Sequence, residues 1–216
     1  MIVLNLKTYE ASIQKPLYFV DIASEIVAET GVRVIVCPPA LNLHEAAERF
    51  SGVFAQHTDP ESPGAYTGSI DAEMLKHAKV KGSLVNHSER RLTRDKIKIV
   101  VERLHSNGLE SIVCAASAKE SGDLASFSPS FIAVEPPELI GSGVSVSKSK
   151  PQVISDTVNA VRESNDKVPV LCGAGISDRN DVEKALALGS SGVLLASAFV
   201  KAKDPKAFLK DLAGAF

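Results

Sequence analysis

A carboxylate at the end of a short apolar run is the first candidate for chemistry in this chain. The segment Phe131–Gly143 reads FIAVEPPELIGSG: the apolar run ends at Glu135, two prolines follow, and a Gly-Ser-Gly closes the loop. Proline fixes φ and stiffens the start of the loop, whereas glycine lets backbone approach a ligand closely. The pattern is typical of a strand that leads into a hinged lid, with a base at its tip. A solvated glutamate before an ordinary surface loop would have the same local sequence.

Two other apolar runs end in polar residues that could assist such a base. Asn5 and Lys7 are two residues apart, so they point to the same side of an extended segment, and Lys7 could supply a fixed positive charge. His87 lies in the sequence Asn-His-Ser-Glu-Arg-Arg. We expect Ser88 to begin a short helix whose positive end would keep the His87 ring neutral. The alternatives are a lysine that already lies in solvent and a capping serine beside an incidental histidine.

Two runs near the C-terminus end in small residues instead. Cys172–Asp178 reads CGAGISD and Leu195–Ala198 reads LASA, so backbone N–H groups would be accessible to a ligand at both places. Such turns are a common phosphate-binding arrangement. Small residues also occur at turns for packing alone, so both interpretations stay open at this point.

These candidate residues need elements to bring them together, and the chain supplies a regular alternation of strands and helices. Short apolar runs predict eight strands, at Ile2–Asn5, Val32–Cys37, Val53–Gln56, Gly82–Asn86, Ser111–Cys114, Phe131–Glu135, Val168–Gly173 and Gly192–Ala196. Amphipathic periodicity and capping residues predict the helices, at Lys15–Thr30, Leu41–Phe50, Asp71–His77, Thr93–Asn107, Lys119–Leu124, Lys150–Ser164, Asp178–Leu188 and Pro205–Ala213. Gly31 is the expected C-cap of the first helix, and Asp71 and Asp204 are expected N-caps.

Apolar strands that alternate with helices predict a parallel sheet covered by helices. Eight such units in 216 residues predict one (β/α)₈ barrel domain over residues 1–216. In that fold the chemistry lies at the C-terminal ends of the strands, where all the candidate residues stand. A doubly wound open sheet is the alternative, but its usual glycine-rich first turn is absent from the segment LNLKTYEAS.

Composition narrows the class of protein. The chain is 44% hydrophobic with a formal net charge of −2 and a sequence pI near 6.2, so a surface for nucleic acid or anionic membrane is not expected. Three cysteines in apolar runs predict reduced, buried thiols in a cytosolic protein rather than disulfides. The first residues, MIVLNLK, lack the pattern of a signal peptide, and no apolar run is long enough to span a bilayer.

Several segments in order resemble the signature segments of the triosephosphate isomerase family. They are Asn-Leu-Lys near the start, Asn-His-Ser-Glu-Arg-Arg, and Ala-Val-Glu-Pro-Pro-Glu-Leu-Ile-Gly-Ser-Gly, together with Cys37–Ala40, Ala55–Gly68, Cys172–Ser177 and the pair Ala196-Ser197. Several motifs in one order are specific, whereas any one alone is weak. The chain is most similar to the shorter, archaeal-type form. It departs from the longer form in lacking the lid tryptophan, in having Ala196-Ser197 in place of paired glycines, and in having His57 after Gln56.

The resemblance implies interconversion of dihydroxyacetone phosphate and D-glyceraldehyde 3-phosphate through an enediolate, in glycolysis and gluconeogenesis. It implies that Glu135 is the base, that His87 polarises the carbonyl, that Lys7 balances the negative charge and that Asn5 orients the substrate. Backbone near Ile140, Gly141, Gly175, Ala196 and Ser197 would hold the phosphate, and Pro136–Ser145 would close as a lid.

The resemblance further implies an enzyme with no metal and no organic cofactor, and no cluster with zinc spacing is visible in the sequence. Its expected partner is a second copy of itself: the long polar loop His57–Gly68 would reach into a neighbouring subunit of a homo-oligomer, a tetramer. A cytoplasmic location is expected. Two alternatives remain: an aldolase or lyase with a Schiff base on Lys7 or Lys148, and a barrel that only binds metabolites or partners.

Overall fold

Eight parallel strands form the centre of the molecule. The computed structural model describes residues 1–136, 151–173 and 175–216. The sheet order is β2-β1-β8-β7-β6-β5-β4-β3, and every paired neighbour runs parallel. The strands are β1 Ile2–Asn5, β2 Val34–Cys37, β3 Phe54–Ala55, β4 Gly82–Val85, β5 Glu110–Ala115, β6 Phe131–Val134, β7 Val170–Cys172 and β8 Gly192–Leu195.

The sheet curls until its two end strands meet. β2 and β3 are joined by the parallel bridge between Val36 and Val53 and by a hydrogen bond of 2.9 Å from the Val36 N–H to the Gly52 carbonyl. β1 pairs with β8, so the first and the last strand of the chain are neighbours in the sheet. A doubly wound sheet is open and does not have this strand order. The predicted (β/α)₈ barrel is therefore confirmed, and the open-sheet alternative is wrong.

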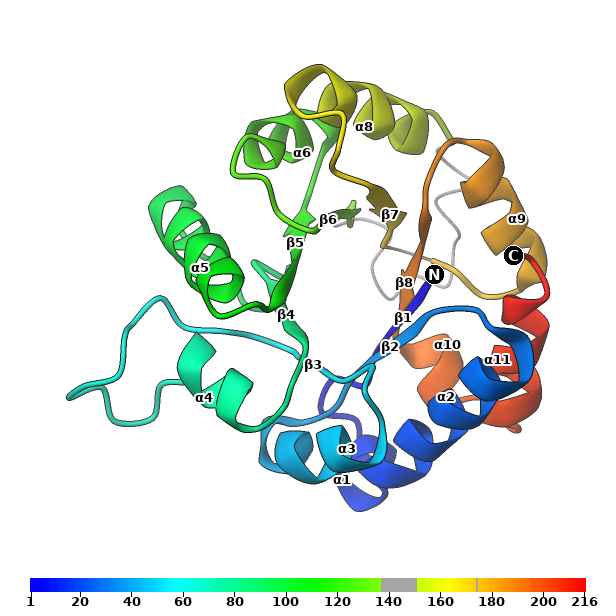
Figure 1. Ribbon diagram of the computed structural model, residues 1–216. Helices are drawn as coiled ribbons and strands as arrows, with labels where there is room; N and C mark the ends of the chain where they lie inside the picture. The colour runs from blue at the N-terminus through cyan, green and yellow to red at the C-terminus, as the bar shows by residue number, and fades with distance from the viewer. Residues whose placement is uncertain (137–150, 174) are drawn as a thin grey trace.

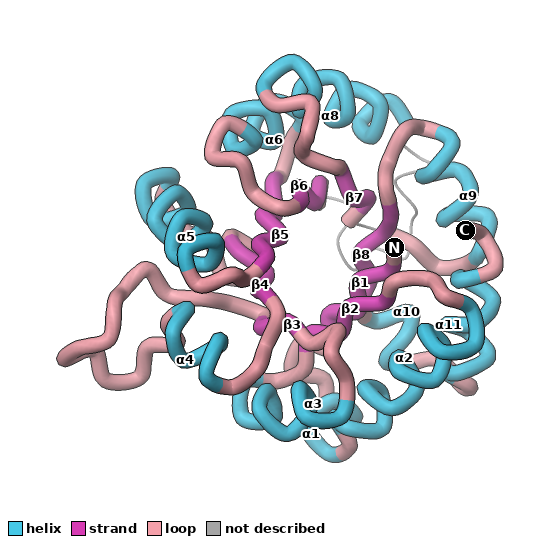
Figure 2. Tube along the Cα trace, in the orientation of Figure 1, coloured by secondary structure: helices cyan, strands magenta, loops and turns pink. Residues whose placement is uncertain are grey.

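The helices form a ring outside the strands (Figures 1 and 2). Within the described residues they are α1 Glu10–Gln14, α2 Pro16–Thr30, α3 Leu43–Arg49, α4 Ala72–His77, α5 Arg94–Ser106, α6 Ala118–Ala125, α8 Pro151–Ser164, α9 Arg179–Ala187, α10 Ser197–Val200 and α11 Pro205–Ala213, with a 3₁₀ turn at Ala40–Asn42. The short helices α1 and α10 were not predicted from the sequence. Both have too few residues to show a periodic apolar face.

Local capping explains why several helices begin and end where they do. Gly31 has φ 71° and donates its N–H to the Val27 carbonyl, as expected for a glycine C-cap. Asp71 accepts a hydrogen bond from the Met74 N–H, and Asp204 accepts one from the Ala207 N–H. These three predicted caps are confirmed.

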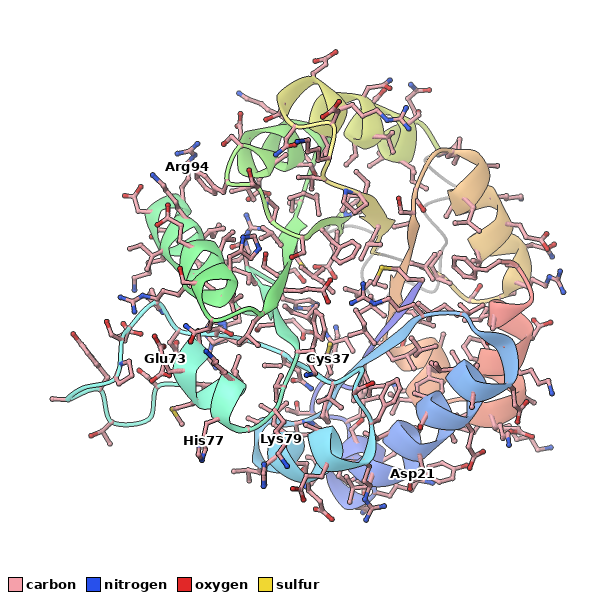
Figure 3. All side chains as sticks on the ribbon, in the orientation of Figure 1. Asp21, Cys37, Glu73, His77, Lys79 and Arg94 are labelled. Atoms are coloured by element: carbon pink, nitrogen blue, oxygen red, sulfur yellow. The ribbon has the colours of Figure 1, made fainter. Side chains whose placement is uncertain are left out.

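The apolar residues separate into two buried sets. Those that point into the barrel include Val3, Ile35, Cys37 and Cys114, while their neighbours along each strand pack against the helices. Figure 3 shows Cys37 inside the ring of strands, with Asp21 and Arg94 on the helices outside it. All three cysteines are buried. The strands therefore read as continuous apolar runs because both of their faces are covered.

No helix of the described segments combines the length and the apolar character needed to cross a membrane.

Candidate active site

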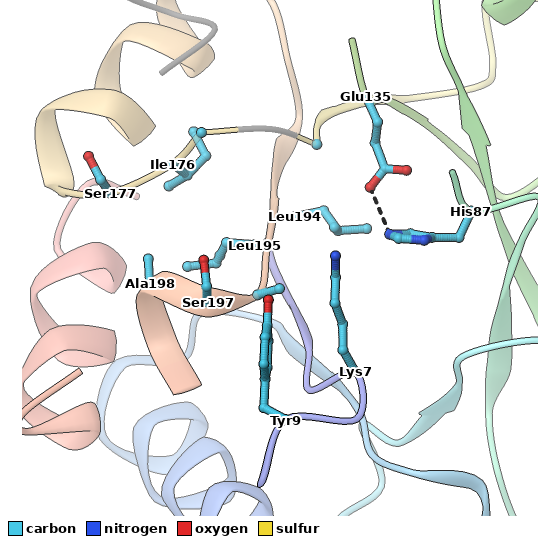
Figure 4. Close-up of a pocket in the computed structure, with 13 residues that line it drawn as sticks. Lys7, Tyr9, His87, Glu135, Ile176, Ser177, Leu194, Leu195, Ser197 and Ala198 are labelled. Atoms are coloured by element: carbon cyan, nitrogen blue, oxygen red, sulfur yellow. Dashed lines mark ion pairs between the residues drawn. The ribbon is translucent and has the colours of Figure 1, made fainter. Parts of the chain in front are cut away.

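A cavity of about 110 Å³ opens at the C-terminal ends of the strands. Five strands lead into it, because the residues after β1, β4, β6, β7 and β8 all line its wall (Figure 4). The lining residues are Lys7, Tyr9, His87, Glu135, Gly173, Gly175, Ile176, Ser177, Leu194, Leu195, Ala196, Ser197 and Ala198. The cavity thus unites the predicted base, imidazole, cation and small-residue turns.

Glu135 and His87 face one another in this cavity. The Oε1 atom of Glu135 lies 3.3 Å from the Nε2 atom of His87, and only 3% of the Glu135 surface is exposed. The Glu135 backbone N–H donates to the Ala115 carbonyl at 2.8 Å. This bond continues the ladder between β5 and β6 to the start of Glu135. Its second carboxylate oxygen, Oε2, is buried without a hydrogen-bond partner. A buried oxygen without a partner is poised to accept a proton or a hydrogen bond from a ligand.

Gly173 makes room for the Glu135 side chain. A Cβ atom on Gly173 would lie 2.6 Å from the Cγ of Glu135 and 2.8 Å from the Val134 carbonyl oxygen. The Gly173 N–H also donates to that carbonyl at 2.9 Å. Because β6 and β7 approach so closely here, any larger residue at position 173 would displace the carboxylate.

The His87 ring is oriented by a turn, and the helix expected at Ser88 is wrong. Residues 88–90 form a turn closed by a 2.8 Å hydrogen bond from the Arg90 N–H to the His87 carbonyl, and α5 begins only at Arg94. Within the turn the Glu89 N–H donates to His87 Nδ1 at 3.2 Å. A nitrogen that accepts a hydrogen bond carries no proton, so the ring proton lies on Nε2, directed at Glu135. One backbone amide therefore orients the ring at the place where a helix terminus was expected.

Lys7 stands on a strained backbone and is held from both sides. Its φ is 46°, in the left-handed region that side chains other than glycine rarely adopt. Its N–H donates to Asn5 Oδ1 at 3.0 Å, and Gln56 Nε2 donates to its carbonyl at 3.0 Å. The Nζ atom pairs with Glu89 Oε1 at 2.8 Å, although the Lys7 side chain is only 14% exposed. Figure 4 shows this ammonium group pointing toward His87 and Glu135.

Asn5 lies beside this group but opens onto a different space. It lines an adjoining cavity of about 310 Å³, which it shares with Lys7, His87 and the loop residue His57. Its Oδ1 atom is occupied by the Lys7 N–H. The described geometry thus gives Asn5 a direct contact with the Lys7 backbone.

The expected phosphate-binding residues that the structure describes lie together at the far end of the 110 Å³ cavity. Gly175, Ala196 and Ser197 all line it. Gly175 has φ 70°, and the loop that follows is fastened because Asp181 Oδ2 accepts from both the N–H and the hydroxyl of Ser177, at 3.0 and 2.7 Å. Ile140, Gly141, Lys148 and all of the expected lid after Pro136 lie outside the described residues.

Sequence reasoning missed Tyr9, which also lines the cavity. Figure 4 shows its ring beside Lys7, with the hydroxyl directed into the cavity on the side of Ser197. The Lys201 ammonium lies 5.1 Å from the centre of this ring. The signal that could have revealed Tyr9 is its spacing, because it follows Lys7 by two residues just as Lys7 follows Asn5.

Cys114 lies beneath the carboxylate and is chemically quiet. Burial, followed by the negative charge of Glu135, raises the pKa of the Cys114 thiol well above its ordinary value. The thiol therefore stays protonated and hydrogen-bonds to the Glu135 carboxylate, so it is no nucleophile. Across the described segments no three histidine, cysteine or acidic side chains are grouped as metal ligands would be.

A (β/α)₈ barrel with a buried carboxylate, an imidazole and a lysine beside a turn of small residues is an enzyme of proton-transfer chemistry on an anionic substrate. A sequence model described as "Triosephosphate isomerase" matches residues 1–213. Proteins of that name from Methanothermus fervidus and Methanocaldococcus jannaschii are 48% and 46% identical, over 98% of this chain and 96% and 98% of theirs. The crystal structure of triosephosphate isomerase from Bartonella henselae superposes with a TM-score of 0.74 at 20% identity, covering 96% of each chain.

The chain therefore belongs to the triosephosphate isomerase family. Enzymes of this family interconvert dihydroxyacetone phosphate and D-glyceraldehyde 3-phosphate, a step of glycolysis, so the chain is an intramolecular aldose–ketose isomerase. The predicted similarity to the shorter, archaeal-type form is confirmed by these relatives of matching length. The aldolase and the non-catalytic barrel are set aside as alternatives.

Proposed function

We propose that Glu135 is the base of this isomerisation and that His87 is its electrophile. The observation that carries the proposal is the 3.3 Å approach of Glu135 Oε1 to His87 Nε2 in the buried cavity. A substrate that binds in the cavity against both side chains would present its C–H to the carboxylate and its carbonyl oxygen to the Nε2 proton. Glu135 would move the proton between C1 and C2 while His87 stabilises the enediolate oxygen.

Lys7 supplies the positive charge for this substrate. Its side chain lines the same cavity, and its ammonium group points toward the reacting pair. An ammonium carries three N–H donors, so its ion pair with Glu89 does not exhaust them. The phosphate and the developing oxyanion both gain from a cation in a site that excludes water. Asn5 contributes by holding the Lys7 backbone in its left-handed conformation and, as the family implies, by orienting the substrate.

The phosphate is held by backbone N–H groups of Gly175, Ala196 and Ser197. Their common place in the cavity supports this role. By the family resemblance Ile140 and Gly141 complete the grip, and the loop Pro136–Ser145 closes as a lid that excludes water from the enediolate. Hydrogen exchange at residues 140–142 should slow when a phosphoglycolate-type analogue binds. Equal exchange with and without the analogue would argue against a moving lid.

A coupled assay of D-glyceraldehyde 3-phosphate conversion tests the residue roles directly. The parent protein should turn over substrate, whereas Glu135→Gln keeps the shape of the side chain but removes the base. His87→Gln keeps a donor but loses the oriented imidazole. Both variants should retain binding of inorganic phosphate and lose most of kcat. A Glu135→Gln variant with parental kcat would remove Glu135 from the mechanism.

We also propose that the protein assembles with copies of itself as a homotetramer in the cytoplasm. The long loop His57–Gly68 is consistent with a subunit contact, and the exposed apolar residues Leu41, Ile13 and Tyr66 offer further surface; Leu41 is 100% exposed. Buried cysteines and a glycolytic reaction agree with a reducing compartment. Light scattering at micromolar concentration should give four times the mass of one chain. A fully active monomer would contradict the assembly, and fractionation of the source cells tests the location.

A further inference from the structure

Asn86 precedes His87 and occupies an unusual place in the sheet. Its φ is 62°, and none of its surface is exposed. Asparagine tolerates this left-handed region better than most residues, yet the conformation still costs free energy compared with glycine. A buried side chain in this conformation therefore points to interactions that depend on it.

The Asn86 amide makes two hydrogen bonds in different directions. Its Oδ1 atom accepts from the Leu92 N–H at 2.9 Å, which closes the segment that carries His87 and Glu89 into a loop. Its Nδ2 atom donates to the Cys114 carbonyl on β5, also at 2.9 Å. Both ends of the turn and the neighbouring strand are thus fastened to one side chain.

The bond to Cys114 continues the sheet beyond the point where its backbone ladder ends. β4 and β5 are in register from Gly82 opposite Glu110 to Val85 opposite Val113. Asn86 then reaches the next residue of β5 with its side chain. The residue after that, Ala115, accepts the backbone N–H of Glu135 from the other side. The residue before His87 is therefore anchored to Cys114, and Glu135 is anchored to the next residue of the same strand, Ala115.

We propose that Asn86 is the positioning residue that sets the distance between His87 and Glu135. This inference rests on the proposed function, because it concerns how the reacting pair is aligned. Without the amide, the turn would lose its side-chain link to β5, and the Glu89 N–H that orients His87 Nδ1 could shift together with the ring. The active geometry would then depend on a loop free to shift relative to the carboxylate.

A merely structural role for Asn86 predicts a different outcome. Asparagine could simply cap the turn and satisfy buried backbone groups, in which case its loss would lower the melting temperature and leave kcat unchanged. A positioning role predicts a fall in kcat in protein that remains folded. The ratio of the kcat effect to the KM effect separates the two.

The experiment compares Asn86→Gly and Asn86→Asp with the parent. Glycine accepts φ 62° without strain but has no amide, so it removes both bonds and keeps the backbone conformation. Aspartate can still accept from the Leu92 N–H but cannot donate to the Cys114 carbonyl. We expect each variant to lose on the order of 10- to 100-fold in kcat, the range that a displacement near 1 Å produces, with little change in KM. Lys79→Gly is the matched control, because Lys79 has φ 64° on the outside of the barrel and its replacement should leave kcat unchanged.

A double variant shows whether Asn86 acts through His87. If it does, Asn86→Gly combined with His87→Gln should be no slower than His87→Gln alone. Nitrogen NMR of the His87 ring should show the Nε2–H tautomer in the parent and a mixture of tautomers in Asn86→Gly. Parental kcat in a folded Asn86→Gly variant, or fully additive losses in the double variant, would overturn the inference. Parental kcat in His87→Gln would overturn the proposed function itself.

Discussion

The two ends of the barrel contain cavities of opposite character. The cavity at the N-terminal ends of the strands has about 400 Å³, against about 110 Å³ for the cavity at the C-terminal ends that Glu135 lines. Two of its charged residues, Arg33 and Glu110, pair with each other and remain 47% and 37% exposed. The smaller cavity holds a nearly buried carboxylate and imidazole. Size therefore does not identify the active site, whereas buried titratable groups at strand ends do.

The cause of this difference is the direction of the strands. In a parallel barrel every strand delivers its last residue and the following loop to the same end. Glu135 follows β6 directly and His87 lies two residues after β4, and both strands are paired with β5 between them. At the opposite end the chain returns from helices through short turns, where the ion pair of Arg33 and Glu110 is open to solvent.

The largest expected effect is a change in the base itself. Glu135→Asp keeps the charge but withdraws the carboxylate by about 1.5 Å. We expect kcat to fall by on the order of 100-fold with little change in KM, because proton abstraction depends on close alignment. Steady-state kinetics in both directions provides the measurement. Glu110→Asp at the other end of the barrel is the control and should have parental kcat.

A kcat of Glu135→Asp within about threefold of the parent would correspond to a change in activation free energy of less than about 1 kcal/mol. That result would mean that Glu135 is not the base. Glu89, which pairs with Lys7 beside the cavity, would then be the first carboxylate to test.

Matched glycine substitutions should separate catalysis from stability. In Gly173→Ala the new methyl group would lie 2.6 Å from Glu135 Cγ, so we expect about a tenfold or greater loss of kcat from misalignment of the base. In Gly82→Ala the new methyl group would lie 2.4 Å from the Glu110 carbonyl oxygen at the other end. That variant should lose about 1–3 kcal/mol of unfolding free energy through overpacking. Its kcat, measured well below its melting temperature, should be unchanged.

Thermal melts and kinetics on the same two preparations provide this test. A Gly82→Ala variant that loses kcat while it stays folded would show that the two ends are mechanically coupled. That result would contradict the expectation that the N-terminal end affects only stability.

The smallest expected effect is on pH dependence, where the two ends should behave alike. Burial, the largest cause, lowers the pKa of His57 at the C-terminal end and of His105 near the start of β5. The neighbouring carboxylates of Asp59 and Glu110 oppose the shift without reversing it. Because the folded protein binds these protons more weakly, the unfolded chain takes up more protons below its histidine pKa of about 6.5. The free energy of unfolding should therefore decrease as the pH falls through that value.

Melting temperatures between pH 7.5 and pH 5 would measure this slope. His57→Gln and His105→Gln should each reduce it, and the double variant should reduce it further. A slope that is unchanged in both single variants would assign the acid sensitivity to other groups.

Local physical chemistry explains the part of the fold that could be predicted. Gly31, Asp71 and Asp204 act within a few residues of their own positions, and such caps are readable without a tertiary structure. Helix α10 was missed because it has four residues, and the expected helix at Ser88 was wrong because a serine also begins a turn. Tyr9 and Gly173 were missed as site residues because their contacts come from other strands.

The sequence by itself determined the order of eight apolar runs and the chemical groups at their ends. Those features depend on side-chain type and on spacing within one segment, and both can be read directly from the amino-acid sequence. Only the tertiary structure decided that Glu135 lies 3.3 Å from His87, that Asn5 faces the adjoining cavity, and that Asn86 anchors the turn to β5. The reason is that these distances join residues far apart in sequence, and they arise only when the register of the strands and the closure of the barrel are set together.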